Sequence, residues 1–423
     1  MNRGFYTIIA AQFFSSLADN ALLIVSIALL ATMQSPAWMT PMLKLFFVLS
    51  YVLLAPFVGA FADAFPKGRV MFITNLVKVV GCLMMFLHVH PLLAYAVVGF
   101  GAAAYSPAKY GILTELLPPE KLVAANGWIE GLTVLSIIFG TVLGGALVSQ
   151  QFAAYLPSIV AVPDALLVEA PIEFALGVVM CSYVLAALFN LKIPDTGAHY
   201  AHQERHPIKL VIDFSQCFIK LWRDRLGQIS LAVTSLFWGA GATLQFIVLK
   251  WAEKALGMPL DKAAILQGVV AVGVAFGAVA AARTIPLKKS LSVMPVGFAM
   301  GLVVILMTLA HSISVAYPLL VIVGALSGYF VVPMNALLQH RGHVLMSAGH
   351  SIAVQNFSEN LSILIMLSLY ALMVKLDLNV YVVIVLFGLF VSSSMWLIMK
   401  KHAANQAQFD SMHLIGEEKH VGT

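Results

Sequence analysis

Long apolar runs separated by short polar segments set the pattern of this chain. The first run extends from Phe5 to about Met33, and similar runs recur as far as Lys400. A helix that crosses the hydrocarbon core of a bilayer needs about 20 mostly apolar residues, and about 12 runs meet that criterion. Only helices can satisfy their own backbone polar groups in such runs. The pattern therefore predicts an all-α membrane protein.

The predicted spans fall into two sets of six on either side of a polar stretch. Their limits are 5–33, 43–63, 69–89, 92–113, 122–149 and 172–193, then 226–250, 262–284, 291–311, 315–339, 348–374 and 378–400. We therefore expect an N-terminal half at 1–193, a cytoplasmic linker at 194–225, a C-terminal half at 226–400 and a cytoplasmic tail at 401–423. The tail is polar and short, so we expect it to be mobile.

The basic residues predict the orientation in the membrane. Lys and Arg are richer in the loops of one side, and such loops face the cytoplasm. Both termini and the linker are then cytoplasmic. The segment 150–171 holds Asp164 and Glu169 but no Lys or Arg, which fits an outside loop. The first run is too long for the core of a secretory signal, so we expect it to be retained.

Composition supports a membrane protein and excludes several other classes. The chain is 61% hydrophobic and 10% charged, whereas soluble domains carry roughly 25% charged residues. Cys82, Cys181 and Cys217 have neither disulfide nor metal-ligand spacing, so no metal is expected. A glycine-rich ATP-binding motif with its lysine is absent from the sequence, which speaks against ATP-driven transport and against a nucleotide cofactor. The formal charge of +5 is spread over short loops and does not indicate nucleic acid.

Three short matches relate the two sets of spans. Internal repeats of this kind are common in transporters. The pairs are Gly59, Asp63, Pro66 and Lys67 with Gly277, Arg283, Pro286 and Lys288; Pro107 to Lys109 with Pro333 to Asn335; and Glu130 to Thr133 with Glu359 to Ser362. Their common order predicts a duplicated six-helix unit.

The stretch GAFADAFPKGRV, Gly59 to Val70, resembles the loop signature of the major facilitator superfamily, with two extra residues before its glycine-arginine turn. Gly59 allows close helix approach. Asp63 can pair with Arg69 or cap a neighbouring helix. We expect Gly59, Asp63, Lys67 and Arg69 to form a gate that opens as the halves move; the alternative is a plain basic loop.

A closer resemblance covers the chain up to about Lys400. Its segments are SLADNALL from Ser16, AYSPAKYGILTELLPPEKLVAANGWIEGL from Ala104, SLFWGAGATLQF from Ser235, VVPMNALLQ from Val331 and AVQNFSENL from Ala353. Together they resemble the bacterial lysophospholipid transporter family. The resemblance implies an inner-membrane protein, here expected to be a monomer. It implies that lysophosphatidylethanolamine and lysophosphatidylglycerol move from the outer leaflet to the cytoplasmic leaflet by alternating access, for re-acylation by a partner acyltransferase.

The chain is not expected to be an enzyme. An acyltransferase signature places an aspartate five positions after a histidine, and none of the 12 histidines has one. The acyltransferase would then be a separate protein.

Five charged residues lie inside predicted spans, where charge is costly and usually functional. They are Asp19, Lys78, Lys109, Glu130 and Glu359. Asp19 could contact an ammonium head group or a coupling cation, or could form a structural ion pair with Lys109. Lys109 suits phosphate, as a compact cation with three donors. Lys78 is expected to snorkel or to contact a neighbouring helix, outside the site.

Other polar residues complete the predicted site. Gln355 and Glu359 are four apart and share a helix face, as do Asn356 and Asn360. Relatives in the family carry arginine at the position of Gln245, which places more weight on Lys109. The predicted substrate and ion site is Asp19, Asn20, Lys109, Glu130, Trp238, Gln245, Asn335, Gln355, Asn356, Glu359 and Asn360. Coupling to sodium, to protons or to neither is left open.

Three other functions compete with this interpretation. A drug or small-solute antiporter of the same superfamily would share Asp63, Lys67 and Arg69 but not the pattern at 106–113 and 355–360. A membrane enzyme would need a catalytic histidine-aspartate pair near one membrane face. A scaffold without transport would have no use for the five charges within the spans.

Overall fold

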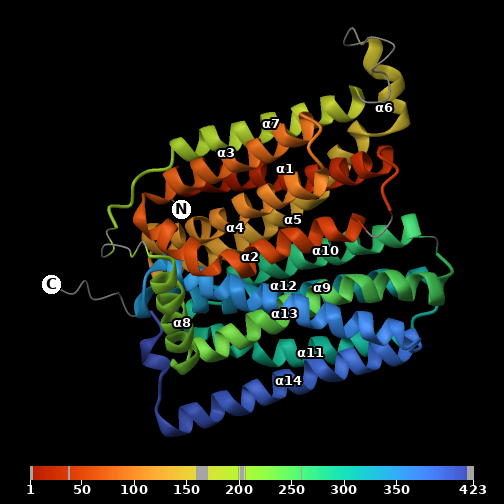
Figure 1. Ribbon diagram of the computed structural model, residues 1–423. Coiled ribbons are helices and arrows are strands. Elements are labelled where there is room, and N and C mark those ends of the chain that lie inside the picture. The colour runs from red at the N-terminus through yellow and green to blue at the C-terminus, as the bar shows by residue number, and fades with distance from the viewer. Residues whose placement is uncertain are drawn as a thin grey trace. The chain divides into compact units, whose positions relative to one another are not determined.

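The computed structural model describes residues 3–36, 39–158, 170–198, 200, 204, 206–258 and 260–416. The regular elements in these ranges are all helices (Figure 1). Twelve of the helices so described are long and apolar enough to cross a membrane. The predicted fold class and number of spans are therefore confirmed.

The spanning helices lie close to their predicted limits. They are α1 (Arg3–Thr32), α2 (Met39–Ala64), α3 (Lys67–Phe86), α4 (Pro91–Leu116), α5 (Leu122–Leu147), α7 (Ala170–Leu191), α9 (Gly227–Leu256), α10 (Leu260–Thr284), α11 (Met294–Ile305), α12 (Ile313–Leu345), α13 (Ala348–Lys375) and α14 (Val380–Gln408). Short 3-10 turns, η4 (Leu287–Val293) and η5 (Leu306–Leu309), extend α11 at both ends. Helices α9, α12 and α14 continue past their predicted ends because a helix can leave the bilayer without a break in its backbone hydrogen bonds.

Among the described residues, four shorter helices lie in connecting segments and a fifth lies in the tail. They are η1 (Pro119–Lys121), α6 (Gln150–Tyr155), η2 (Leu156–Ser158), α8 (Pro207–Arg223) and η6 (Met412–Leu414). The segment expected to be an outside loop thus begins with a helix, which Ser149 caps by accepting a hydrogen bond from the Phe152 backbone N–H at 3.2 Å. Asp164 and Glu169 lie outside the described residues.

The helices form two compact units. The first contains Met1–Ile112 and Leu135–Leu210, and the second contains Leu113–Val134 and Val211–Thr423. The adjoining ends of α4 and α5, with η1 between them, thus belong to the second unit. These units are defined by packing, so the division of the chain into repeated halves at 193 and 226 stays a prediction.

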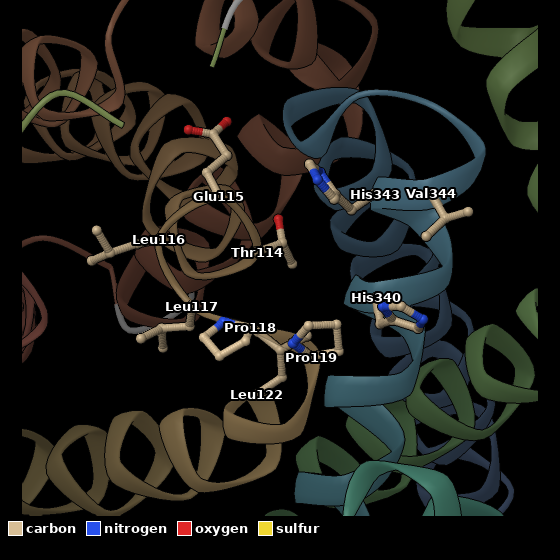
Figure 2. Close-up of a pocket in the computed structure, with 10 residues that line it drawn as sticks. All are labelled: Thr114, Glu115, Leu116, Leu117, Pro118, Pro119, Leu122, His340, His343 and Val344. Carbon is tan, nitrogen blue, oxygen red and sulfur yellow. The ribbon is translucent and has the colours of Figure 1, made fainter. Parts of the chain in front are cut away.

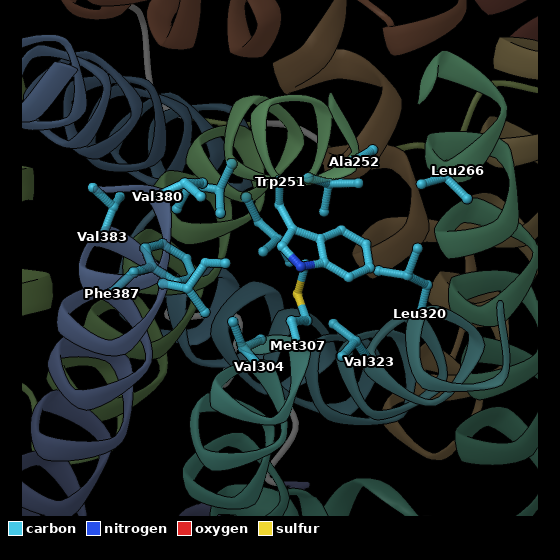
Figure 3. Close-up of a cluster of buried hydrophobic side chains, with 14 of the residues drawn as sticks. Trp251, Ala252, Leu266, Val304, Met307, Leu320, Val323, Val380, Val383 and Phe387 are labelled. Carbon is cyan, nitrogen blue, oxygen red and sulfur yellow. The ribbon is translucent and has the colours of Figure 1, made fainter. Parts of the chain in front are cut away.

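Each unit has its own apolar core. In the first, α1 and α3 both pack on α7, around buried residues such as Leu22 and Tyr183. In the second, α9 packs on α13 and α11 on α14. Figure 3 shows the centre of the second core, where the Met307 side chain lies against the fully buried indole of Trp251. The buried cluster as a whole joins α9 to α12 and α14.

Helices α10 and α12 are held together by facing glycines. A Cβ built on Gly277 would lie 2.0 Å from the carbonyl oxygen of Ala325, and one built on Gly328 would lie 2.1 Å from that of Val274. Gly273 and Gly324 make the same kind of contact one turn away. Small residues spaced by four allow two helix backbones to touch.

The linker and tail are more ordered than expected. Asp224, after α8, accepts a hydrogen bond from the Gly227 backbone N–H at 2.7 Å and pairs with Arg341 of α12 at 2.6 Å. In the tail, Ile415 is buried, and the Gly416 backbone N–H donates to Nε2 of His340 at 2.9 Å. The expectation of a mobile tail is wrong up to Gly416, because these residues bury apolar surface and backbone groups on α12.

Substituting Gly277 by alanine should destabilise the second unit. The new methyl group would meet a backbone carbonyl that cannot move aside, and overpacking of this kind costs about 1–3 kcal/mol. Thermal unfolding in detergent micelles measures the change. Gly268→Ala is the matched control, since a Cβ at this position of the same helix meets nothing within 4 Å. Equal melting temperatures for the two variants would contradict the close contact.

Candidate functional site

The centre of the first unit contains an ion pair between α1 and α3. The Lys78 ammonium lies 2.9 Å from both carboxylate oxygens of Asp19. The Tyr183 hydroxyl of α7 donates to the same carboxylate at 2.7 Å. Lys78 also donates to Ser15 at 3.0 Å, and Ser15 donates to Asn75 at 2.8 Å. Three spanning helices are therefore joined by one polar network.

The partner of Asp19 differs from the expected one. The predicted structural alternative paired Asp19 with Lys109, but the carboxylate is bound by Lys78 and Tyr183. Of the two roles expected for Lys78, contact with a neighbouring helix is confirmed and snorkelling to the interface is wrong. Its side chain is 1% exposed, so the ammonium cannot reach water and needs a buried anion.

The fourth helix makes room for this lysine. A Cβ at Gly101 of α4 would lie 2.8 Å from Cγ of Lys78 and equally close to the Thr74 carbonyl oxygen. The Lys78 ammonium also faces the Tyr105 ring, whose centroid is 5.1 Å away. The sequence offered one signal for Lys78, a lone cation within an apolar run.

The two ends of the ion pair differ in access. The Asp19 side chain is 22% exposed, whereas Lys78 is almost completely covered. Asp19 can thus be reached by a cation or a polar head group while Lys78 balances its charge from behind. Asn20 takes no part in this network, because its side-chain amide donates to the backbone carbonyl of Ser16 at 2.8 Å.

Lys109 also lies in the first unit, on α4. Its side chain is buried, and the ammonium is 3.9 Å from the centroid of the neighbouring Tyr110 ring. A cation over an aromatic face is stabilised by the ring quadrupole. The charge and the three donors of its ammonium suit an anionic group.

The second unit holds a buried amide cluster on α12 and α13. The Gln355 side chain donates to Glu359 at 2.8 Å and to Asn335 at 3.2 Å. Its Oε1 atom is buried and has no hydrogen-bond partner in the described part of the chain. An acceptor left in this state can receive a donor from a ligand. Asn356 is buried, and its backbone carbonyl accepts from the Asn360 side chain at 2.8 Å.

Sequence reasoning missed a second amide pair. The side chains of Asn126 on α5 and Gln339 on α12 exchange two hydrogen bonds of 2.9 Å each. Both residues are fully or almost fully buried. Asn126 is four residues before Glu130, itself buried, so both lie on one face of α5. The four-residue spacing from Glu130 was the signal in the sequence by which Asn126 could have been found.

Trp238 and Gln245 on α9 lie in different surroundings. The indole nitrogen of Trp238 is buried without a hydrogen-bond partner among the described residues, and its ring packs on Phe237. Gln245 has an exposed side chain, and its backbone carbonyl accepts from Gln267 at 3.2 Å. Gln245 is therefore not part of the buried polar clusters.

The predicted gate has a different ion pair from the expected one. Lys67 pairs with Asp63 at 2.7 Å across the turn from α2 to α3, and both side chains are at most 3% exposed. The Lys67 ammonium also donates to the Ala62 carbonyl. Arg69, the expected partner of Asp63, is exposed. Gly59 is buried on α2.

A pocket of about 270 Å³ lies within the second unit (Figure 2). Its walls come from the end of α4 with the following loop and from α12. They contain Thr114, Glu115, Leu116, Leu117, Pro118, Pro119, Leu122, His340, His343 and Val344. Pockets for small molecules usually measure roughly 300–1,000 Å³. This one is too small for a head group together with an acyl chain, so we assign no substrate to it.

Replacing one partner of the Asp19–Lys78 pair should lower the stability of the protein more than replacing both. Asp19→Asn leaves the Lys78 ammonium buried and uncompensated, which costs about 3–5 kcal/mol. The double variant Asp19→Asn/Lys78→Met removes the stranded charge and should recover most of the lost stability. Melting temperatures in detergent micelles test this. If the double variant melts as low as Asp19→Asn alone, charge compensation is not what holds the pair.

Solved structures with the same fold are transporters. The crystal structure of the major facilitator superfamily transporter FucP in the outward conformation matches with a TM-score of 0.73 at 12% identity, over 95% of this chain and 98% of that one. A bacterial homologue of the iron transporter ferroportin, in the outward-facing state with soaked iron, gives 0.71 at 13% identity, over 96% and 100%. At such low identity these matches show the fold alone.

Sequence comparisons identify the family. The Major Facilitator Superfamily model matches residues 5–367. The chain is 43% identical over 382 residues to "Lysophospholipid transporter LplT" of Yersinia enterocolitica, covering 90% of this chain and 89% of the relative. It is 42% identical to the protein of that name from Pectobacterium carotovorum, with the same coverage. The chain therefore belongs to the lysophospholipid transporter family of the major facilitator superfamily, as its motifs suggested.

Proposed function

We propose that this protein carries lysophospholipids, chiefly lysophosphatidylethanolamine and lysophosphatidylglycerol, from the outer leaflet to the cytoplasmic leaflet of the bacterial inner membrane. The observation that carries this proposal is the 43% identity over nine tenths of the chain to proteins named as lysophospholipid transporters. The basic loops of one side support cytoplasmic termini. A separate acyltransferase would then restore the missing acyl chain, and the transporter itself would catalyse no reaction.

The first unit offers groups for both charges of a lysophosphatidylethanolamine head group. Lys109 is a buried cation and can bind the phosphate. The accessible part of Asp19 can bind the ammonium, because its side chain is 22% exposed although Lys78 and Tyr183 contact the carboxylate. The second unit separately presents Oε1 of Gln355, an acceptor without a hydrogen-bond partner among the described residues. The acyl chain would remain against apolar side chains throughout.

Alternating access would follow from rocking of the two repeated halves. The Asp63–Lys67 pair lies at a turn between two spans of one half, and both of its side chains are buried. A movement that exposes this turn to water would weaken the pair, since water screens exposed charges. The pair therefore suits a gate that favours one state over the other.

Transport can be tested with the purified protein in liposomes. A fluorescent lysophosphatidylethanolamine is added to the outer leaflet, and albumin then extracts what has not crossed. We expect a protected fraction well above that of protein-free liposomes. A solute antiporter would protect no more lysolipid than the empty liposomes, and that result would overturn the proposal.

Lys109→Gln should reduce the initial rate of lysolipid transport by about tenfold or more, because a charge-assisted hydrogen bond to phosphate contributes about 1.5–3 kcal/mol. Lys121→Gln is the matched control, since Lys121 is an exposed cation on η1. Equal rates for both variants and the wild type would make Lys109 a structural residue.

Coupling to an ion can be decided with the same liposomes. We propose that a sodium ion or a proton competes with Lys78 for Asp19, whose carboxylate is partly accessible. Replacing a sodium gradient by potassium should then slow transport if sodium is the ion, and a protonophore should slow it if the proton is. Insensitivity to both changes would indicate facilitated diffusion and exclude a coupling role for Asp19.

A further inference from the structure

Helix α8, in the linker that was expected to be a plain polar stretch, has one face packed on the second unit. Phe214 and Leu221 are buried. The ring centroids of Phe214 and Phe218 lie 5.4 and 5.9 Å from that of Phe357 on α13. The Lys220 ammonium also donates to the carbonyl of Leu345 at the end of α12. The helix is thus fixed along its protein-facing side.

A second face of α8 is apolar but exposed. Its large side chains are between 37% and 66% accessible, and they are Ile208, Val211, Ile212, Ile219 and Trp222. They lie within about 100° of one another around the helix, with Ser215 between Ile212 and Ile219, and so form one stripe. We call these five residues the α8 stripe. It is separate from the buried face of Phe214 and Leu221, about a third of a turn away.

The third face of α8 is polar. Lys209, Gln216 and Arg223 are exposed and lie beside the stripe, on the side opposite the buried face of Phe214 and Leu221. The Lys209 ammonium forms an ion pair with Glu204 at 3.2 Å. This ion pair is exposed to solvent and therefore weak. A helix with one face on protein, one apolar face and one basic face fits a boundary where protein, lipid and water meet.

The position of α8 along the chain places it at a membrane surface. Asp224 directly follows the helix, accepts from the backbone N–H of Gly227, the first residue of the span α9, and pairs with Arg341 near the end of the span α12. The end of α8 is therefore held where two spans of its unit reach one face of the membrane. In Figure 1, α8 runs across the direction of α9, α12 and α13.

We propose that α8 is a membrane-surface helix. It inserts the α8 stripe between lipids at the membrane face where α9 begins, and Lys209 and Arg223 bind anionic phospholipid head groups. Amphipathic helices with basic polar faces bind anionic bilayers in this way. Trp222 suits the interface, where tryptophan is enriched. Lys209 and Arg223 beside the stripe are complementary in charge to anionic lipid head groups, and this complementarity favours an anionic bilayer over a protein partner. The proposal is independent of the substrate that is transported.

Spin labels on the full-length protein can test this placement. Cys181 and Cys217 are replaced by serine and the buried Cys82 is kept. A nitroxide is then attached to cysteine introduced by Ile212→Cys or Ile219→Cys, and by Gln216→Cys as the matched position on the polar face. The protein is reconstituted into phosphatidylglycerol-containing liposomes without any other protein. Collision rates with oxygen and with a water-soluble nickel chelate report depth.

We expect the labels at positions 212 and 219 to collide with oxygen several-fold more than with the nickel chelate, and the label at position 216 to show the reverse. Two stripe positions are used so that local disturbance by one label does not decide the result. Labels at 212 and 219 that are as accessible to nickel as the label at 216 would overturn the proposal. That result would leave the stripe open to water, for a protein partner or none.

The basic face has its own test. In the protein labelled at position 212, depth should be greater in phosphatidylglycerol liposomes than in phosphatidylcholine liposomes. The double substitution Lys209→Gln/Arg223→Gln should abolish this difference, while Gln216→Ser, on the same face, should preserve it. If the label at position 212 lies equally deep in both lipids while Lys209 and Arg223 are intact, the proposed binding of anionic head groups is overturned.

Discussion

A charge in the hydrocarbon layer must be balanced inside the protein, and the Asp19–Lys78 ion pair meets this constraint in the first unit. Lys78 is almost completely covered and has both oxygens of Asp19 within 2.9 Å. Tyr183 donates to the same carboxylate, so α1, α3 and α7 are fixed around it. Gly101 must remain small for the lysine to fit. The accessibility of Asp19 from the other side depends on this arrangement, because Lys78 holds the carboxylate in place.

The second unit buries amide groups beside a carboxylate. The Gln355 amide donates to Glu359 and to Asn335, and a further amide pair joins Asn126 to Gln339. Amides need less compensation than charges when they are buried. Glu359 thus receives a hydrogen bond from a neutral group, whereas Asp19 in the first unit is paired with a cation.

The spans could be predicted from the sequence because length and apolarity alone decide whether a helix can cross a bilayer. Asp19, Lys109 and Glu359 could be selected as candidate site residues because charge is rare in such runs. The partner of Asp19 could not, since Lys78 and Lys109 are both lone cations and only packing decides between them. Helix α8 was missed because Lys209, Asp213 and Lys220 interrupt its apolar residues, so no apolar run there is long enough to cross a bilayer. The ordered tail was missed because its contacts are backbone groups, as at Gly416 and His340.

The contact between α10 and α12 limits how the second unit can change shape. Packed helices usually shift past each other by changing side-chain rotamers at their interface. Where Gly277 meets the Ala325 carbonyl, and Gly328 that of Val274, no side chain lies between the backbones. If one helix slid along the other, a carbonyl oxygen would leave its glycine and collide with the Cβ atom of the next residue on the partner helix. These two helices should consequently travel as one rigid pair during a transport cycle, which leaves bending and sliding to interfaces lined by flexible side chains, such as that of Met307 with Trp251.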